Sequence, residues 1–282
     1  KKYLIRQPEG AGLYDVPIVE DVTEYFPSDY RIGFGIRKLG RFGYERKPGN
    51  FWTGDQNVDW SRSDGFPSVI PEALSLGMSG MSTTHIDIGL YTTMVNQTYD
   101  SVNFDVIRCK ELLLRTAEYA VFTPVMRTHE SNRPDSNWQV YTDDDTINRY
   151  SRLTNIHKIL NPYLDYVIKY EAQSLNLPVQ RPLCLEFPND FECDNSDHHL
   201  YQFMLGSDVL VAPVITPNTK TQKVVLPTSY GTWVHIWTGT KYENQRTIEV
   251  DAIVGNIPVF YKENSEFSDI FESLAEFGAR LL

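Results

Sequence analysis

The spacing of apolar residues divides the chain into three stretches of different character. Up to residue 65 the spacing is irregular, and only 3–7 (YLIRQ) and 17–27 (PIVEDVTEYFP) resemble short strands. From 66 to about 207, runs with helical spacing alternate with short extended runs. Beyond 207, short β-branched and aromatic runs are separated by Gly, Pro and Asn, which is typical of strands joined by turns.

The middle stretch predicts helices that alternate with strands. Helical spacing covers 67–81, 106–122 and 143–176, the last as one long helix or two. Extended runs cover 85–91, 125–130 and 178–187, and polar residues gather where these runs end. This alternation is typical of a β/α barrel or a doubly wound sheet. In a barrel, the chemistry lies at the carboxyl ends of the strands.

The last stretch predicts an antiparallel β-sandwich, because several short strands with turn residues between them are typical of that fold. Its expected strands cover 208–215, 222–227, 231–239, 246–252 and 257–263. The chain contains no internal repeat, and no long flexible linker separates this stretch from the middle one.

Composition excludes several kinds of protein. Apolar residues make up 41% and charged residues 22%, which is usual for a folded globular chain. The net charge of −11 would repel a phosphate backbone, and no stripe of Lys and Arg offsets it, so nucleic acid is excluded as a partner. No run of about 18 apolar residues exists, which predicts no membrane span. The first residues lack the apolar stretch of a signal peptide, and the compartment stays open.

The cysteines and histidines do not predict a metal site. Cys109, Cys184 and Cys193 lack metal-ligand spacing, and their odd number allows one disulfide but no disulfide framework. The histidines do not follow the spacing of metal ligands either.

Several carboxylates could form the acid pair of a hydrolytic enzyme. Such a pair needs one ionised group and one that its surroundings keep protonated. The candidates at strand or loop ends are Asp21, Asp55, Asp59, Asp64 and Asp87, with Glu24 and Glu130 as further choices. Taken singly, each is more simply a loop residue or a helix cap. Asp55 stands out because Trp52 and Trp60 flank it, and tryptophan can both stack on a sugar and raise the pKa of a carboxylic acid by desolvation.

A second polar group ends the extended run 125–130. Arg127 and His129 could donate hydrogen bonds to the hydroxyls of a sugar ring. Arg127 could instead pair with the acidic helix start at 143–145. The aromatic content of 13% fits either a carbohydrate-binding protein or a large aromatic core.

Ordered motifs along the chain resemble the C-terminal half of glycoside hydrolase family 31, the retaining α-glucosidase and α-xylosidase family. The motifs are FWTGDQNVDWSRSDG, HIDIGLYTTM, AVFTPVMRTHESNRPDSNWQ, LPVQRPLCLEF, DVLVAPV, WVHIWTG and IPVFY. Within that family the chain is most similar to the sulfoquinovosidase branch. The resemblance covers about residues 50–270, with an apparent insertion near 95–104.

The resemblance assigns roles to individual residues. Asp55 in WTGDQ matches the general acid/base, and Asp21 in EDVTEYFP resembles the nucleophile motif. The further matches are to substrate-binding residues: Trp52, Asp87, Tyr91, Arg127, His129 and Arg41. Among these, Tyr91 matches a tyrosine that helps to hold the sulfonate in the sulfoquinovosidase branch. Arg41 and Arg127 could supply positive charge for that anion.

The resemblance also implies a fold and an activity. Residues 1–207 should form the C-terminal part of a (β/α)8 barrel, and 208–282 a β-sandwich domain. The chain should be a retaining α-glycoside hydrolase for small sulfoquinovosides that needs no metal or organic cofactor. Two alternatives stay open: an α-glucosidase or α-xylosidase of the same family, and a truncated carbohydrate-binding protein without activity.

Overall fold

The computed structural model describes residues 2–6, 13–17, 51–99, 102–191, 196–244 and 246–279. Asp21 and Arg41 lie outside these ranges, as does most of the strand predicted over 17–27. At the start of the chain, β1 (Lys2–Arg6) and β2 (Leu13–Pro17) pair antiparallel, and β1 confirms the short strand expected there.

Three neighbouring segments run parallel in the middle of the chain. β3 (Phe51–Trp52) pairs with β4 (Thr84–His85), and the N–H of Thr53 continues the ladder to the carbonyl of His85 at 3.1 Å. After β4, Ile88 forms a parallel bridge with Thr128. The carboxyl ends of the three segments therefore meet at one edge, as the sequence predicts. The run 125–130 is only a bridge and not a full strand.

The helix α2 (Val69–Met78) connects β3 to β4, after a 3-10 turn η2 (Phe66–Ser68). Apolar residues three and four positions apart give α2 one buried face, which contains Val69, Ile70, Ala73, Leu74 and Gly77. Gly80 follows the helix at φ +93°, a conformation that ends helices and favours glycine. The helix predicted over 67–81 is confirmed.

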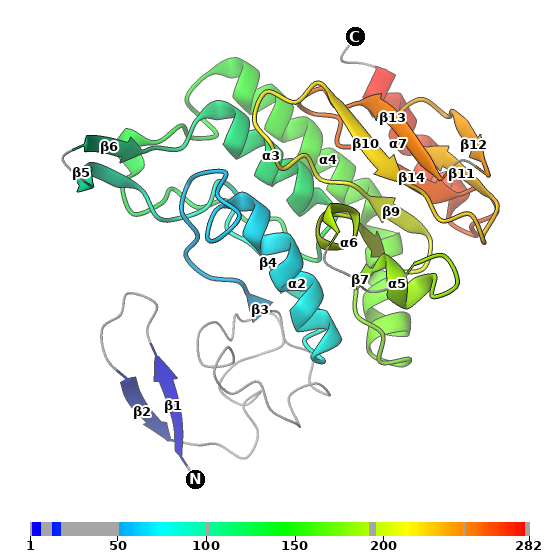
Figure 1. The fold of residues 1–282 in the computed structure, drawn as a ribbon, viewed down its shortest axis with the longest axis horizontal. Helices are drawn as coiled ribbons and strands as arrows, with labels where there is room; N and C mark the ends of the chain where they lie inside the picture. Colours follow the sequence, from blue (N-terminus) through cyan, green and yellow to red (C-terminus); the bar gives the residue numbers. More distant parts are fainter. Residues whose placement is uncertain are drawn as a thin grey trace.

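Helices α3 (Lys110–Val121) and α4 (Asp144–Tyr166) pack side by side (Figure 1). All residues of α3 from 112 to 121 are buried. α4 begins where the Asp143 carboxylate accepts the N–H of Thr146 at 2.7 Å, which is a standard N-cap. It continues directly into the π-helix η4 (Val167–Ala172), so within the predicted run 143–176 the residues 144–172 form one continuous helical stretch.

A hairpin that was not predicted precedes α3. Its strands are β5 (Met94–Tyr99) and β6 (Val102–Val106), and it extends away from the body of the molecule (Figure 1). On one face the hydroxyl of Thr98 donates to Asn103 at 2.7 Å. The strand β6 ends at 106, where the helix α3 was expected to begin.

The C-terminal part contains a six-stranded antiparallel sheet in the order β12-β11-β14-β9-β8-β7 and a separate pair β10–β13. The strands are β7 (Gln180–Pro182), β8 (Phe203–Leu205), β9 (Val209–Val211), β10 (Thr221–Val225), β11 (Thr232–His235), β12 (Lys241–Glu243), β13 (Thr247–Asp251) and β14 (Val259–Lys262). The helices are α5 (Leu183–Glu186), α6 (Asp197–Tyr201) and α7 (Ser268–Ala279), with a 3-10 turn η3 (Pro134–Ser136) earlier in the chain.

One apolar cluster joins the two sheets of this part. Met204, Leu210 and Phe260 of the six-stranded sheet pack with Val224 and Ile248 of the pair. The five strands predicted after 207 are confirmed. The strand predicted over 178–187 is wrong in its second half, because α5 replaces it. The sheet includes β7 and β8 and so begins before residue 208, and a domain division at 207/208 stays a prediction.

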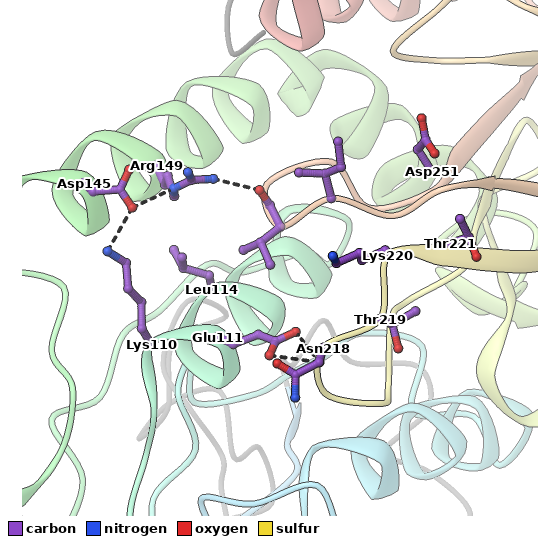
Figure 2. A pocket seen from close by; sticks show the side chains of 12 residues that line it. Lys110, Glu111, Leu114, Asp145, Arg149, Asn218, Thr219, Lys220, Thr221 and Asp251 are labelled. Carbon is purple, nitrogen blue, oxygen red and sulfur yellow. Dashed lines mark hydrogen bonds and ion pairs between the residues drawn. The ribbon is translucent and has the colours of Figure 1, made fainter.

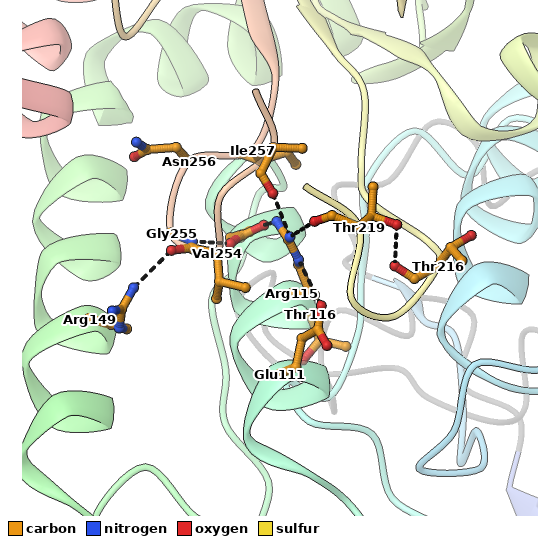
Figure 3. A network of polar contacts seen from close by, with 12 residues as sticks. Glu111, Arg115, Thr116, Arg149, Thr216, Thr219, Val254, Gly255, Asn256 and Ile257 are labelled. Carbon is orange, nitrogen blue, oxygen red and sulfur yellow. Dashed lines mark hydrogen bonds and ion pairs between the residues drawn. The ribbon is translucent and has the colours of Figure 1, made fainter. Parts of the chain in front are cut away.

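Buried charges attach the C-terminal loops to α3 and α4 (Figure 3). Arg115 of α3 donates to the carbonyls of Ala252 at 2.6 Å and Thr219 at 3.1 Å, and it pairs with Glu118 at 3.0 Å. The Glu118 carboxylate in turn accepts the N–H of Gly255. Both charged side chains are almost fully buried, so this network fixes how the second part packs on the helices.

Candidate active site

The loop after β3 places Asp55 at the edge where the parallel segments end. Gly54 has φ +110°, a value that glycine adopts without strain, and it turns the chain just before Asp55. The carbonyl of Asp55 accepts the hydroxyl of Thr92 at 2.8 Å, and the carbonyl of Gln56 accepts the N–H groups of Tyr91 and Thr92. The loop that carries Asp55 is therefore held against the loop that follows β4.

Asp87 and Arg127 form a buried ion pair beside this loop. The Asp87 side chain is 1% exposed, and that of Arg127 is 23% exposed. The Arg127 guanidinium also lies over the Trp52 ring, 6.0 Å from its centre. One side chain from each of the three parallel segments thus takes part in a single cluster.

Tyr91 and His129 extend the same cluster. Their rings meet edge to face, with centroids 4.9 Å apart and planes at 81°. The N–H of Ser131 donates to Nδ1 of His129 at 2.9 Å. In the neutral imidazole the proton therefore sits on Nε2, which can donate to a sugar hydroxyl.

The structure thus brings together six of the eight predicted site residues: Trp52, Asp55, Asp87, Tyr91, Arg127 and His129. The other two, Asp21 and Arg41, lie outside the described residues. The alternative role of Arg127, an ion pair with the acidic helix start, is wrong. Lys110 instead pairs with Asp143 at 2.8 Å and Asp145 at 2.9 Å.

Two neighbours of Asp55 in the sequence have structural roles. The carboxylate of Asp59 accepts the N–H of Ser61 at 2.8 Å, which closes a local turn. Trp60 packs edge to face on the core residue Phe66, with centroids 5.9 Å apart. Of the two flanking tryptophans, Trp52 is the one that contacts the polar cluster.

Sequence reasoning missed the residues that support this cluster. Asn132 accepts the N–H of Thr93 at 2.8 Å, and Asn137 donates to Thr93 at 2.7 Å. Arg108 donates to the carbonyl of His129 at 2.8 Å. A signal was present in SNRPDSNWQ, where many amide and hydroxyl side chains directly follow a strand end.

Comparison with known protein families identifies the chain. A model described as the glycosyl hydrolases family 31 TIM-barrel domain matches residues 20–166, just over half of the chain. The family's C-terminal domain matches residues 176–265. The chain belongs to glycosyl hydrolase family 31. Members of this family are glycoside hydrolases, and the resemblance inferred from the motifs is confirmed.

Sulfoquinovosidases are among the relatives most similar to this family 31 chain. The protein of Escherichia coli K12 is 42% identical over 84% of this chain and 33% of its own length. That of Agrobacterium fabrum is 41% identical over 80% of this chain and 32% of its own length. The solved structure of a family 31 sulfoquinovosidase from E. rectale, in complex with an aza-sugar inhibitor, superposes with a TM-score of 0.73. It is 40% identical, over 86% of this chain and 36% of that one. The chain therefore spans about a third of the length of these relatives.

A cavity of about 710 Å³ in the family 31 chain lies away from the polar cluster, between α3, the start of α4 and the loops beside β10 and β13 (Figure 2). Its charges largely offset one another: Arg149 pairs with Asp145, and Glu111 accepts the N–H of Asn218. No aromatic side chain lines it. It lacks the aromatic surface on which sugars stack, and it is not the candidate site.

Three further observations concern the described part of the chain. Its His, Cys, Asp and Glu side chains do not gather in groups of three that could hold a metal ion. None of its helices is both long and apolar enough to cross a membrane. Cys184 is disulfide-bonded, whereas Cys109 is an exposed free thiol.

Proposed function

We propose that this chain carries the acid/base and part of the sugar-binding surface of a retaining α-glycoside hydrolase that cleaves α-linked sulfoquinovosides. The observation that carries the proposal is the cluster at the ends of the three parallel segments. There the Asp55 loop, the Asp87–Arg127 pair and the Tyr91–His129 pair lie side by side. The identity of about 42% to a sulfoquinovosidase supports the substrate class.

The reaction proposed has two displacements. A carboxylate oxygen of Asp21 attacks the anomeric carbon, the bond to the leaving oxygen breaks, and Asp55 donates its proton to that oxygen. Asp55 then takes a proton from water while the water oxygen attacks the anomeric carbon and frees the Asp21 carboxylate. Retaining enzymes hold the two carboxyl groups about 5–5.5 Å apart, so we expect Asp21 to face Asp55 at this separation.

The Asp87–Arg127 pair and His129 suit the hydroxyls of a sugar ring. The Asp87 carboxylate offsets the charge of Arg127, so the pair offers a donor and an acceptor side by side and not a free cation. The negative charge of a sulfonate then needs other partners. We assign the Tyr91 hydroxyl to it, with Arg41 as a source of positive charge. No metal or organic cofactor takes part in this reaction.

The fold proposed is the C-terminal part of a (β/α)8 barrel followed by a β-sandwich, with the predicted division at 207/208. The parallel segments with α2, α3 and α4 support the barrel, and the apolar cluster between the two antiparallel sheets supports the sandwich.

Hydrolysis of aryl glycosides tests the function. The purified protein should cleave an aryl α-sulfoquinovoside with kcat/KM at least about 100-fold above that for the matching α-glucoside or α-xyloside, because a site built for one polar group rejects analogues that lack it. Preference for the glucoside or xyloside would indicate an α-glucosidase or α-xylosidase. Sugar binding without turnover, and no covalent labelling of Asp21 by a cyclitol inhibitor, would indicate a non-catalytic binding protein.

A further inference from the structure

Arg108 is a buried cation that the proposed reaction does not use. It lies between β6 and α3 and is 2% exposed. Among the described residues, no carboxylate lies within ion-pair distance of its guanidinium, whereas the buried Arg115 pairs with Glu118 and the buried Arg181 pairs with Glu171. Burial lowers the pKa of Arg108 to about 10. Burial of a charge without an opposite charge costs free energy unless hydrogen bonds offset that cost. The hydrogen bonds of Arg108 therefore indicate why it is buried at this position.

The Arg108 guanidinium bonds the loop that carries His129. Nη1 donates to the carbonyl of His129 at 2.8 Å, Nε to the carbonyl of Trp138 at 2.7 Å, and Nη2 to the side chain of Gln139 at 2.6 Å. The Gln139 amide then donates to the carbonyls of Glu130 and Pro134. The planar fork thus fixes both ends of the segment 129–139, most of which forms no regular helix or strand.

The same guanidinium packs against the loop that carries Asp87 and Tyr91. At Gly89, an added Cβ would lie 2.3 Å from Nη1 of Arg108, closer than any real contact of that kind. Gly89 also has φ +87°, and its N–H donates to the hydroxyl of Thr116 at 2.8 Å. Arg108 therefore fills the space between the two loops from which three of the predicted substrate-binding residues come: Asp87, Tyr91 and His129.

We propose that Arg108 is a positioning residue: it touches no reacting group, but it sets the 87–91 and 129–139 loops so that Asp87, Tyr91 and His129 face one ligand. The inference rests on the proposed function in taking that ligand to be a sugar. A misplacement of about 1 Å at such a site can lower the rate about 100-fold, so a rigid support for these loops has a direct effect on binding and catalysis.

A purely structural role for Arg108 makes a different prediction, and Arg115 provides the matched control. Arg115 is also almost fully buried, lies seven positions further along the chain, and donates to carbonyls of the C-terminal loops. Arg115→Met should lower stability without affecting the two site loops. Arg108→Met should affect those loops and ligand binding beyond any loss of stability.

The experiment compares wild type, Arg108→Met, Arg108→Lys and Arg115→Met in the whole chain, under conditions where each is folded. Hydrogen exchange of residues 86–93 and 127–139 is measured first, because it needs no turnover. We expect faster exchange in both segments of Arg108→Met, unchanged exchange in Arg115→Met, and an intermediate result in Arg108→Lys, which keeps the charge but loses the fork. If Arg108→Met does not fold, Arg108→Lys carries the comparison.

The second readout is KM for the aryl glycoside that the wild type cleaves, or Kd for the sugar if it only binds. KM or Kd should rise about 10- to 100-fold in Arg108→Met and stay constant in Arg115→Met. Unchanged exchange of both segments, or faster exchange with unchanged KM, would overturn the positioning role. A wild type that neither cleaves nor binds any tested sugar would instead overturn the proposed function, and hydrogen exchange would still decide whether Arg108 sets the loops.

Discussion

The rings of Tyr91 and His129 meet edge to face, with centroids 4.9 Å apart, although the two residues are 38 positions apart in the chain. The parallel bridge between Ile88 and Thr128 brings their backbones together just before the two side chains. Neither ring sits in the main apolar core, so the contact belongs to the edge where the parallel segments end.

Substitution of Tyr91 should separate the two parts of its role. Tyr91→Ala removes the ring from His129, and an edge-to-face pair contributes about 0.5–1.5 kcal/mol. We expect KM to rise for every glycoside that the protein cleaves. Tyr91→Phe keeps the ring and loses only the hydroxyl, so it should raise KM for the sulfoquinovoside and leave the glucoside unchanged. An equal effect of Tyr91→Phe on both substrates would contradict the assignment of its hydroxyl to the sulfonate.

Substitution of Asp55 tests the acid/base assignment. Asp55→Asn keeps the shape of the side chain but can neither donate a proton to the leaving oxygen nor activate water. General acid–base catalysis contributes about 100- to 10,000-fold, and we expect a loss of this size in the turnover of aryl α-glycosides. Asp59→Asn is the matched control, since Asp59 only closes a turn, and should keep most of the activity. Equal turnover by wild type and Asp55→Asn would show that another residue is the acid/base.

The sequence predicts elements well where one physical signal acts alone. The apolar faces of α2 and α3, the Asp143 cap and the strands after 207 follow from periodicity and capping. The hairpin β5–β6 was missed because its alternating run VNFDV is short and its residues are mostly exposed. The helix α7 was also missed, although the apolar residues of 268–279 have helical spacing.

The candidate site likewise contains residues that the sequence predicts and residues that it does not. Motif resemblance predicted the residues that contact one another at the strand ends, because each is a distinctive residue type in a fixed local context. Arg108 and Gly89 carry no such signal: Arg108 becomes important only when the fold places it against two loops distant in sequence. Likewise, the local sequence suggested that Arg127 pairs with the helix start. The buried Asp87 is a better partner because only tertiary contact desolvates it.

The buried pair Arg115–Glu118 should show strong coupling. Both side chains are about 1% exposed, and removal of one partner leaves the other as an uncompensated buried charge, which typically costs about 3–5 kcal/mol. Glu118→Leu and Arg115→Met should each destabilise by about this amount in urea unfolding, and the double variant should lose clearly less than the sum. Lys169, whose pair with Asp165 is exposed, is the control, and Lys169→Met should change stability little. If the stability losses of the two single variants simply add in the double variant, the C-terminal loops do not depend on the Arg115–Glu118 pair.

The stability of the protein should fall in mild acid because of His235. Its side chain is 6% exposed, and its Nε2 has no hydrogen-bond partner among the described residues, while Nδ1 lies 2.9 Å from the Thr238 hydroxyl. Burial lowers the pKa of His235 from 6.5 to about 4. Above pH 6.5 the imidazole is neutral in both the folded and the unfolded chain, so it does not affect the folding equilibrium. Between pH 6.5 and 4 the unfolded chain binds a proton that the folded chain does not, so the folded state loses stability as the pH falls.

A pKa displaced from 6.5 to about 4 corresponds to about 3 kcal/mol once the pH is below both values. The side chain in His235→Gln cannot titrate. Between pH 7.5 and pH 4, the free energy of unfolding in urea should therefore fall by about 3 kcal/mol less in His235→Gln than in wild type. Burial also lowers the pKa of His157, and the acidic groups titrate in this range too, but both are present in either protein and cancel in the difference. Parallel stability curves for the two proteins would mean that His235 gains a proton in the folded state as readily as in the unfolded one, and that its burial in the C-terminal sheet is not retained in acid.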